Sequence, residues 1–151
     1  MVTQAQVEEA QKNWAEAIVK IGRNKADRAA CEHATKETLD NLYAFDLGTV
    51  LFKPTKTSQI QFRGTYEGAF SYFIGGNSSF SEDKGFALQP WTSVRFENTG
   101  FLYTESTAVA MGNYYFYEES GAETKVEYTF GYIKNGESLK INLHHSSIPF
   151  Q

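Results

Sequence analysis

The sequence predicts one α+β domain in which helices come first and a curved antiparallel sheet follows, because three observations agree. Apolar residues recur at helical spacing within the first 42 positions, and period-two alternation dominates from residue 87 onward. An Asn-Gly dipeptide separates the last two alternating runs, as in a tight hairpin. A length of 151 residues suits one domain, and no repeat or linker divides 1–151.

The N-terminal region is predicted to form two helices, and Cys31 lies in the second. The first covers 4–21 and is ended by Gly22, and the second covers 26–42 with a weaker apolar stripe. The apolar positions that define the first helix are Val7, Trp14, Ile18 and Ile21. With a single cysteine in the chain, an intrachain disulfide and cysteine-rich zinc sites are excluded, and we expect Cys31 to be a small buried residue.

The middle of the chain is predicted to contain a short strand and a short helix. Residues 49–52 are β-branched or apolar and are followed by Pro54, which ends a strand. Thr65 is a suitable N-cap for a helix over 66–74, which two glycines then end. Residues 77–85 are expected to form a loop.

The C-terminal part is predicted to supply four long strands joined by short turns. Period-two alternation places them at 87–98, 107–117, 124–134 and 137–147. Asn135 and Gly136 are expected to be the central residues of a type I′ turn between the last two strands.

Charge and hydropathy exclude several classes of partner. The net charge is −4 and the basic residues form no run, so we expect neither nucleic acid nor an anionic membrane as a partner. No segment approaches the roughly 20 apolar residues of a membrane span. The first eleven residues are polar and do not resemble a secretory signal, which leaves the compartment unassigned.

A metal centre or a serine-hydrolase site is not expected. His144 and His145 are adjacent and should face opposite sides of one strand, and His33 lies on a predicted helix. The acidic pair Glu82-Asp83 is interpreted as a solvated surface feature. No Gly-x-Ser-x-Gly motif or glycine-rich phosphate loop is present. Taken together, these features predict neither a metal nor another cofactor.

The last strand carries the most informative polar residues. Leu139, Ile141 and Leu143 share one face, and continued alternation puts His145 and Ser147 on that same face. We therefore expect His145 and Ser147 to point into the core and line a pocket, while His144 faces away. The alternative is that His145 and Ser147 only satisfy each other and the backbone at the strand end.

Two further hydroxyl groups are candidates for the same pocket. Thr55 follows the first strand, and Tyr72 lies on the short helix near the small residues Gly68 and Ala69. The alternatives are that Thr55 caps its own turn and that Tyr72 is a core aromatic with its hydroxyl at the surface.

Five segments in order resemble the iota class of carbonic anhydrases, and together they span most of the chain. They are residues 50–55 (VLFKPT), 67–73 (EGAFSYF), 90–98 (PWTSVRFEN), 125–132 (KVEYTFGY) and 143–149 (LHHSSIP). The His-His-Ser-Ser ending alone is less specific, because it recurs in kinase II association domains and SnoaL-like proteins of the same superfamily.

The resemblance implies a cone-shaped nuclear-transport-factor-2-like fold and a lyase activity, the reversible hydration of CO2 to bicarbonate without a metal. It further implies a bicarbonate site whose threonine, tyrosine, serine and histidine fall on Thr55, Tyr72, Ser147 and His145. Thr55, Tyr72 and Ser147 would bind the substrate, and all four would be catalytic. Such folds commonly pair with a second copy, so at least a homodimer is expected.

Two other functions stay open at this point. The first is a non-catalytic oligomerisation or ligand-binding module of the same superfamily. The second is a small-molecule cyclase or isomerase, which usually needs a carboxylate inside the cone. Glu97 and Glu127 would be the candidates for that carboxylate if they were buried.

Overall fold

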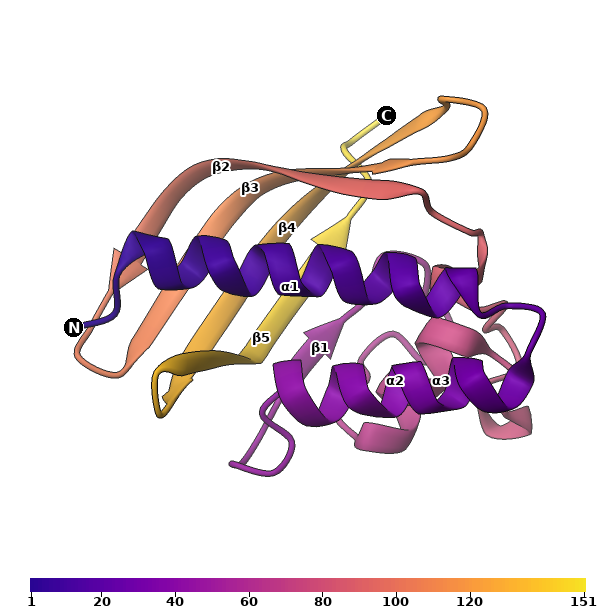
Figure 1. Ribbon diagram of the computed structural model, residues 1–151, viewed down its shortest axis with the longest axis horizontal. Helices are drawn as coiled ribbons and strands as arrows, with labels where there is room; N and C mark the ends of the chain where they lie inside the picture. The colour runs from indigo at the N-terminus through magenta and orange to yellow at the C-terminus, as the bar shows by residue number, and fades with distance from the viewer.

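The computed structural model describes residues 1–151 and contains three α-helices and one five-stranded sheet (Figure 1). The helices are α1 (Gln4–Arg23), α2 (Arg28–Leu42) and α3 (Tyr66–Ile74). The strands are β1 (Leu51–Lys53), β2 (Ser93–Tyr103), β3 (Thr107–Tyr117), β4 (Glu123–Asn135) and β5 (Ser138–Ser147). None of the helices is long and apolar enough to cross a bilayer.

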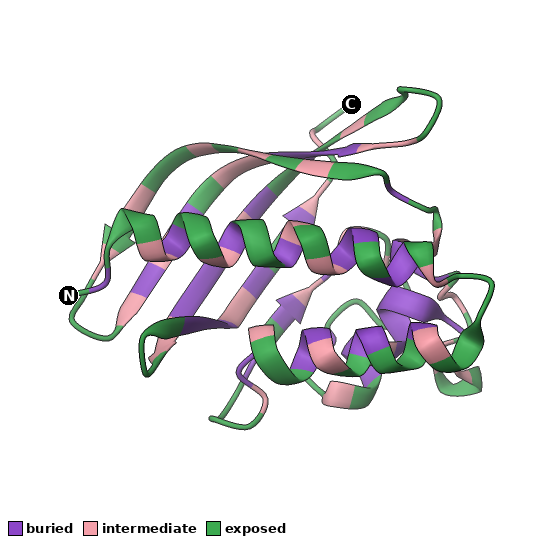
Figure 2. Ribbon diagram, viewed as in Figure 1, coloured by how far each residue is buried: buried purple, intermediate pink, exposed green.

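The sheet is curved, and α1 lies across one of its faces with α2 beside it (Figure 1). The strand order is β1-β5-β4-β3-β2, and every neighbouring pair is antiparallel except β1 with β5. Buried residues lie where α1 and the sheet face each other (Figure 2), so the core is enclosed between them. The predicted α+β class with N-terminal helices is therefore confirmed.

The helix ends follow from their capping residues. Thr65 accepts a hydrogen bond from the backbone N–H of Gly68 at 3.1 Å, which confirms both the cap and the predicted helix over 66–74. The second helix starts two residues later than predicted because the side chain of Asp27 accepts from the N–H of Ala30. Cys31 is buried in that helix, as expected.

Two strand predictions were wrong in detail. The strand expected from residue 87 begins at Ser93, because Phe86–Leu88 forms a 3-10 helix and is followed by Pro90, which has no N–H to pair. The hairpin turn lies one residue later than predicted. Its central residues are Gly136 and Glu137, and it is not a type I′ turn because glycines alone have positive φ angles.

A β-bulge in β5 reverses the expected orientation of the closing residues. Gly131 of β4 pairs with Leu143 and Tyr132 pairs with Ile141, which leaves Asn142 as an extra residue. The extra residue shifts the alternation by one position, so His144 and Ser146 point into the core, 3% and 1% exposed. The predicted inward orientation of His145 and Ser147, and the outward one of His144, are therefore wrong.

Glycine at position 131 is what allows the bulge to sit against β4. A Cβ atom there would lie 2.8 Å from Cβ of Leu143 and 2.9 Å from Oδ1 of Asn142. Both separations are shorter than ordinary van der Waals contacts, so a larger residue would push the bulge away from the sheet.

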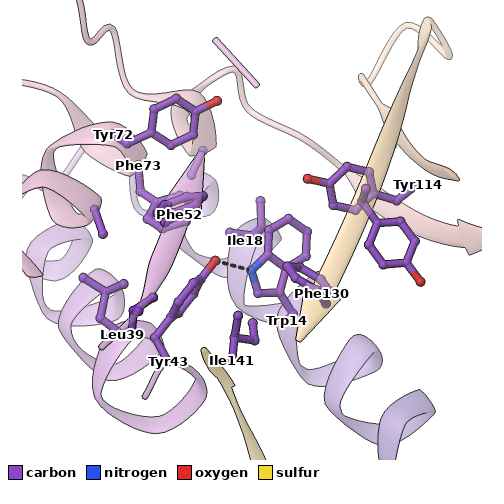
Figure 3. Close-up of a cluster of buried hydrophobic side chains, with 14 of the residues drawn as sticks. Trp14, Ile18, Leu39, Tyr43, Phe52, Tyr72, Phe73, Tyr114, Phe130 and Ile141 are labelled. Carbon is purple, nitrogen blue, oxygen red and sulfur yellow. Dashed lines mark hydrogen bonds between the residues drawn. The ribbon is translucent and has the colours of Figure 1, made fainter. Parts of the chain in front are cut away.

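The core between α1 and the sheet is rich in aromatic side chains, and Figure 3 shows Trp14 near its centre. The indole of Trp14 stacks on Tyr114 with a centroid distance of 5.4 Å. It also meets Phe96, Phe116 and Phe130 edge-on, with centroid distances of 6.1, 6.1 and 5.5 Å. These rings fix the relative positions of α1, β2, β3 and β4.

We predict that Gly131→Ala destabilises the fold by about 1–3 kcal/mol, because the new methyl group overlaps the bulge. Gly100→Ala in β2 is the matched control, since a Cβ there meets no atom within 4 Å. Urea denaturation of both variants measures the difference. An equal, small effect of the two substitutions would show that the bulge tolerates a side chain at position 131.

Candidate active site

The candidate site is a cluster of hydrogen-bonded side chains around His144, inside the aromatic core. Nδ1 of His144 lies 2.9 Å from the hydroxyl of Tyr43. Nε2 lies 3.1 Å from the hydroxyl of Tyr114 and 3.1 Å from that of Ser146. Both ring nitrogens of this buried imidazole therefore have partners.

Aromatic rings from two other strands hold the imidazole in place. The ring of Phe52 in β1 stacks on His144 with a centroid distance of 4.6 Å and an interplanar angle of 15°. The ring of Phe130 in β4 meets it edge-on at 4.3 Å. The imidazole thus has apolar surfaces above and beside it and polar partners only at its two nitrogens.

The hydrogen-bond chain continues behind His144 into the helices. Tyr43 follows the last residue of α2, and its hydroxyl accepts a hydrogen bond from Nε1 of Trp14 in α1 at 3.0 Å, drawn as the dashed line in Figure 3. On the other side of the ring, the hydroxyls of Tyr114 and Ser146 are hydrogen-bonded to each other. Side chains from α1, β3, β5 and the residue that follows α2 therefore meet in one network.

Tyr72 adjoins the cluster through the ring of Phe52, which it meets edge-on with a centroid distance of 6.0 Å, and Thr55 lies nearby in the sequence. Tyr72 is buried, and its hydroxyl accepts a hydrogen bond from the backbone N–H of Lys56 at 3.1 Å. The neighbouring Thr55 is half-buried at the end of β1. The structure therefore brings together two of the four site residues predicted from the sequence, and the idea that the Tyr72 hydroxyl reaches the surface is wrong.

The phenols of the cluster stay protonated at neutral pH. Burial raises the pKa of Tyr72 and of Tyr114 far above the ordinary value of a tyrosine. Polar neighbours lower the pKa of both phenols by a smaller amount, and the side chain of Thr55 is one of these neighbours for each phenol. All three side chains carry hydroxyl hydrogens that can be donated.

His144 is neutral at pH 7. Burial lowers the pKa of His144 well below the ordinary value, and the neighbouring His145 lowers it further. A neutral imidazole has one nitrogen that donates and one that accepts a hydrogen bond. The ring thus connects its two sets of partners without adding a charge to the core.

His145 and Ser147 lie on the opposite face of the sheet from this cluster. His145 is exposed, and with Ser147 it lines a shallow depression of about 290 Å³ between β3, β4 and β5. No hydrogen bond joins the two side chains, so the alternative in which they satisfy each other is also wrong. The inward histidine and serine are their neighbours in the sequence.

Sequence reasoning missed Tyr43 and Tyr114, although one of them left a signal. Inward positions of β3 read Ala108, Ala110, Gly112 and Tyr114, so period-two alternation alone puts the phenol of Tyr114 on the core face. Tyr43 ends a helix, and nothing in the local pattern indicates where its hydroxyl lies. Its partners come from positions 29 and 101 residues away.

No carboxylate faces the cluster. Glu97 and Glu127 are exposed, on the outer face of the sheet. The interpretation of Glu82-Asp83 as a solvated pair was wrong, because the side chain of Asp83 is buried in a bidentate ion pair with Arg63 at 2.7 and 2.8 Å. That charge is already neutralised, so it is not free to act as an acid or base.

Groups that could hold a metal ion are not assembled in this fold. Nowhere do three or more His, Cys, Asp or Glu side chains gather in a way that would coordinate a cation. The cluster around His144 offers one imidazole, and its other donors are neutral hydroxyls, which are weak metal ligands compared with carboxylates and thiolates.

Comparison with known sequences identifies relatives of this chain. Residues 5–148 match the family model of the metal-independent carbonic anhydrases. A metal-independent carbonic anhydrase from Nostoc sp. is 38% identical over 154 aligned positions, which cover 99% of this chain and 75% of the relative.

Solved structures show the same relationship. The crystal structure of a cyanobacterial iota-carbonic anhydrase complexed with bicarbonate superposes with a TM-score of 0.95 and 38% identity, covering 99% of this chain and 94% of that chain. A nuclear-transport-factor-2-like protein from Shewanella oneidensis, 14% identical with a TM-score of 0.55 over 95% of this chain and 97% of that one, shows the fold alone. The predicted cone-shaped fold is thereby confirmed, and the chain belongs to the metal-independent, or iota, family of carbonic anhydrases.

Proposed function

We propose that this chain catalyses the reversible hydration of CO2 to bicarbonate, without a metal, at the hydroxyl cluster beside His144. The observation that carries the proposal is that the hydroxyls of Tyr114 and Ser146 meet Nε2 of a buried neutral histidine. Membership of the family and the bicarbonate complex of a related protein support it.

The cluster suits both forms of the substrate. CO2 is apolar and is compatible with the aromatic surroundings of the cluster, where the rings of Phe52 and Phe130 pack against His144. Bicarbonate is a small planar anion that accepts hydrogen bonds, and the hydroxyls of Thr55, Tyr72, Tyr114 and Ser146 supply donors. In a site of low dielectric, such fixed donors interact with a developing negative charge more strongly than water does.

We propose a proton transfer through one of these hydroxyls. The oxygen of a water molecule bonds to the carbon of CO2, while one water proton moves to the hydroxyl oxygen and the hydroxyl proton moves to an oxygen of CO2. The product is carbonic acid, which releases a proton to solvent and becomes bicarbonate. The hydroxyl ends the step protonated, as it began, so no buried base is consumed.

In this proposal Ser146 takes the predicted role of Ser147, and His144 takes the place of His145 as the histidine of the cluster. The inward pair His144 and Ser146 is buried beside Tyr114, whereas the outward pair faces away from it. Thr55 and Tyr72 keep the roles that the family resemblance implies. His145 and Ser147 then serve as controls, because they have the same chemistry one residue away.

Removal of metals tests the metal-free part of the proposal. We expect CO2 hydration to persist after exhaustive chelation, with metal content measured on the same sample. Zinc lowers the pKa of its bound water from 15.7 to about 7, and hydroxyls alone polarise water less, so the turnover should lie well below that of zinc enzymes. Complete loss on chelation, with recovery on adding a metal back, would contradict the mechanism.

Paired substitutions test the site. Ser146→Ala removes a hydroxyl of the cluster and should lower kcat/KM by about 10²-fold or more, while Ser147→Ala should leave it near wild type. Tyr72→Phe and Thr55→Val should resemble Ser146→Ala, and His145→Gln should resemble Ser147→Ala. Urea denaturation of each variant separates loss of activity from loss of fold. If Ser147→Ala were the inactive member of the pair, the assignment would be reversed.

We also propose that a second copy of the chain covers the outer face of the sheet. One row of paired residues crosses all five strands on that face: Leu102, Val109, Gly131, Leu143 and Leu51. Leu102 and Leu51 are 72% and 61% exposed, and Met111 in the next row is 56% exposed. Such an apolar band on a sheet face is typical of an interface, and a two-fold axis would bury it against itself.

Measurement of the mass in solution tests this proposal. We expect a dimer by sedimentation or light scattering, and a monomer for the double variant Leu102→Lys, Met111→Lys. Leu47→Lys, an exposed apolar residue outside the sheet, is the matched control and should stay dimeric. A monomeric wild-type chain would rule out the interface. A large ring without hydration activity would instead favour the assembly module.

A further inference from the structure

We infer that Trp14 and Tyr43 are positioning residues that hold His144 as the tautomer with its hydrogen on Nε2. In that state His144 donates a hydrogen bond to the Tyr114–Ser146 pair and cannot accept a proton from it. The consequence of this tautomer for catalysis rests on the proposed function. The tautomer itself follows from the hydrogen bonds that join Trp14, Tyr43 and His144.

The direction of the chain is set at Trp14. The indole N–H is a donor only, so the hydroxyl oxygen of Tyr43 must accept at this contact of 3.0 Å. Tyr43 is completely buried, and the one remaining hydrogen-bond partner of its hydroxyl is Nδ1 of His144 at 2.9 Å. The hydroxyl hydrogen therefore points to Nδ1, which must carry the lone pair.

The opposite tautomer would leave a buried hydrogen without an acceptor. With hydrogen on Nδ1, both Trp14 and His144 would donate to the oxygen of Tyr43, and the hydroxyl hydrogen of Tyr43 would have no partner. Buried donors without acceptors are rare in folded proteins, because they lose their hydrogen bond to water and gain nothing in return. The contacts of Tyr43 thus select one tautomer of His144.

The same count on the other side of the ring leaves one hydrogen available to a ligand. Nε2–H donates to either Tyr114 or Ser146, and these two hydroxyls share one hydrogen bond between them. Three hydrogens meet in this triangle and only two are used inside it. The third belongs to a hydroxyl and is directed out of the triangle, where Thr55 or an oxygen of bound substrate can accept it.

This arrangement decides which group moves protons in the proposed reaction. A general base at Nε2 would need a lone pair there, and the chain from Trp14 places a hydrogen on that atom instead. The titratable groups facing the ring are the phenols of Tyr43 and Tyr114, and no carboxylate or ammonium group is hydrogen-bonded to it. His144 is therefore a fixed donor that orients the hydroxyl pair, and the hydroxyls exchange the proton.

NMR of the imidazole nitrogens tests the inference directly. The chain has three histidines, and His33→Gln and His145→Gln assign the signals of the two exposed ones. In the wild-type protein labelled with 15N-histidine, we expect His144 to show a single neutral tautomer protonated on Nε2. Its shifts should stay constant from about pH 8 to pH 5.5, because burial lowers the pKa of His144 well below the usual value for histidine.

Variants separate positioning from packing. Tyr43→Phe removes the donor to Nδ1, so the nitrogen shifts of His144 should move to those of a mixture of tautomers. Trp14→Phe lets the hydroxyl of Tyr43 turn around and should produce a partial change. Tyr132→Phe is the matched control, because Tyr132 is buried in the same core and its hydroxyl has no hydrogen-bond partner. That variant should leave the signals of His144 unchanged.

Each outcome has a definite meaning. Hydrogen on Nδ1 in the wild-type protein overturns the inference, and this test does not require any variant to fold. Wild-type shifts in folded Tyr43→Phe overturn the positioning role. If the Nε2–H tautomer is found but CO2 hydration is absent, the proposed function fails and the inference stands. If hydration is present with hydrogen on Nδ1, the inference fails and the proposed function stands.

Discussion

The burial of the His144 imidazole in an aromatic core is the constraint on which the rest of the site depends. A neutral ring stacked on Phe52 needs a donor at one nitrogen and an acceptor at the other, because neither nitrogen reaches water. Tyr43 and the Tyr114–Ser146 pair meet that need. Tyr43 directly follows α2, and the other two partners lie on β3 and β5, so the hydrogen bonds of one ring fix these three elements relative to each other.

The β-bulge at Asn142 decides which residues of β5 face the helices and which lie on the outer face of the sheet. It turns His144 and Ser146 toward the helices and turns Leu143 to the outer face beside Leu51. The inner face then carries the hydroxyl cluster, and the outer face carries an apolar row suited to a second copy. Gly131 makes this possible, because any side chain there would meet the bulge.

The chemistry proposed for the cluster depends on neutral groups in an apolar setting. Burial raises the pKa of Tyr72 and Tyr114 and lowers that of His144, so all three are uncharged at neutral pH. An uncharged, partly apolar site accepts CO2 without a desolvation penalty for fixed ions. It also offers hydroxyl donors where negative charge develops, which is the form of stabilisation that fixed dipoles provide best.

The sequence by itself determined the helix-then-strand order and the helix over 66–74 with its Thr65 cap, because these follow from local spacing and capping. It also gave Thr55 and Tyr72 as candidate site residues, through the family motifs. It placed the closing histidine and serine on the wrong face. A bulge is defined by how two strands pair, so the sequence of one strand alone does not show where the alternation shifts. Tertiary structure alone decided that His144 and Ser146 face the core. It also decided that Trp14, Tyr43 and Tyr114 join them, because hydrogen bonds between residues 29 to 101 positions apart depend on how the chain packs and have no local signature.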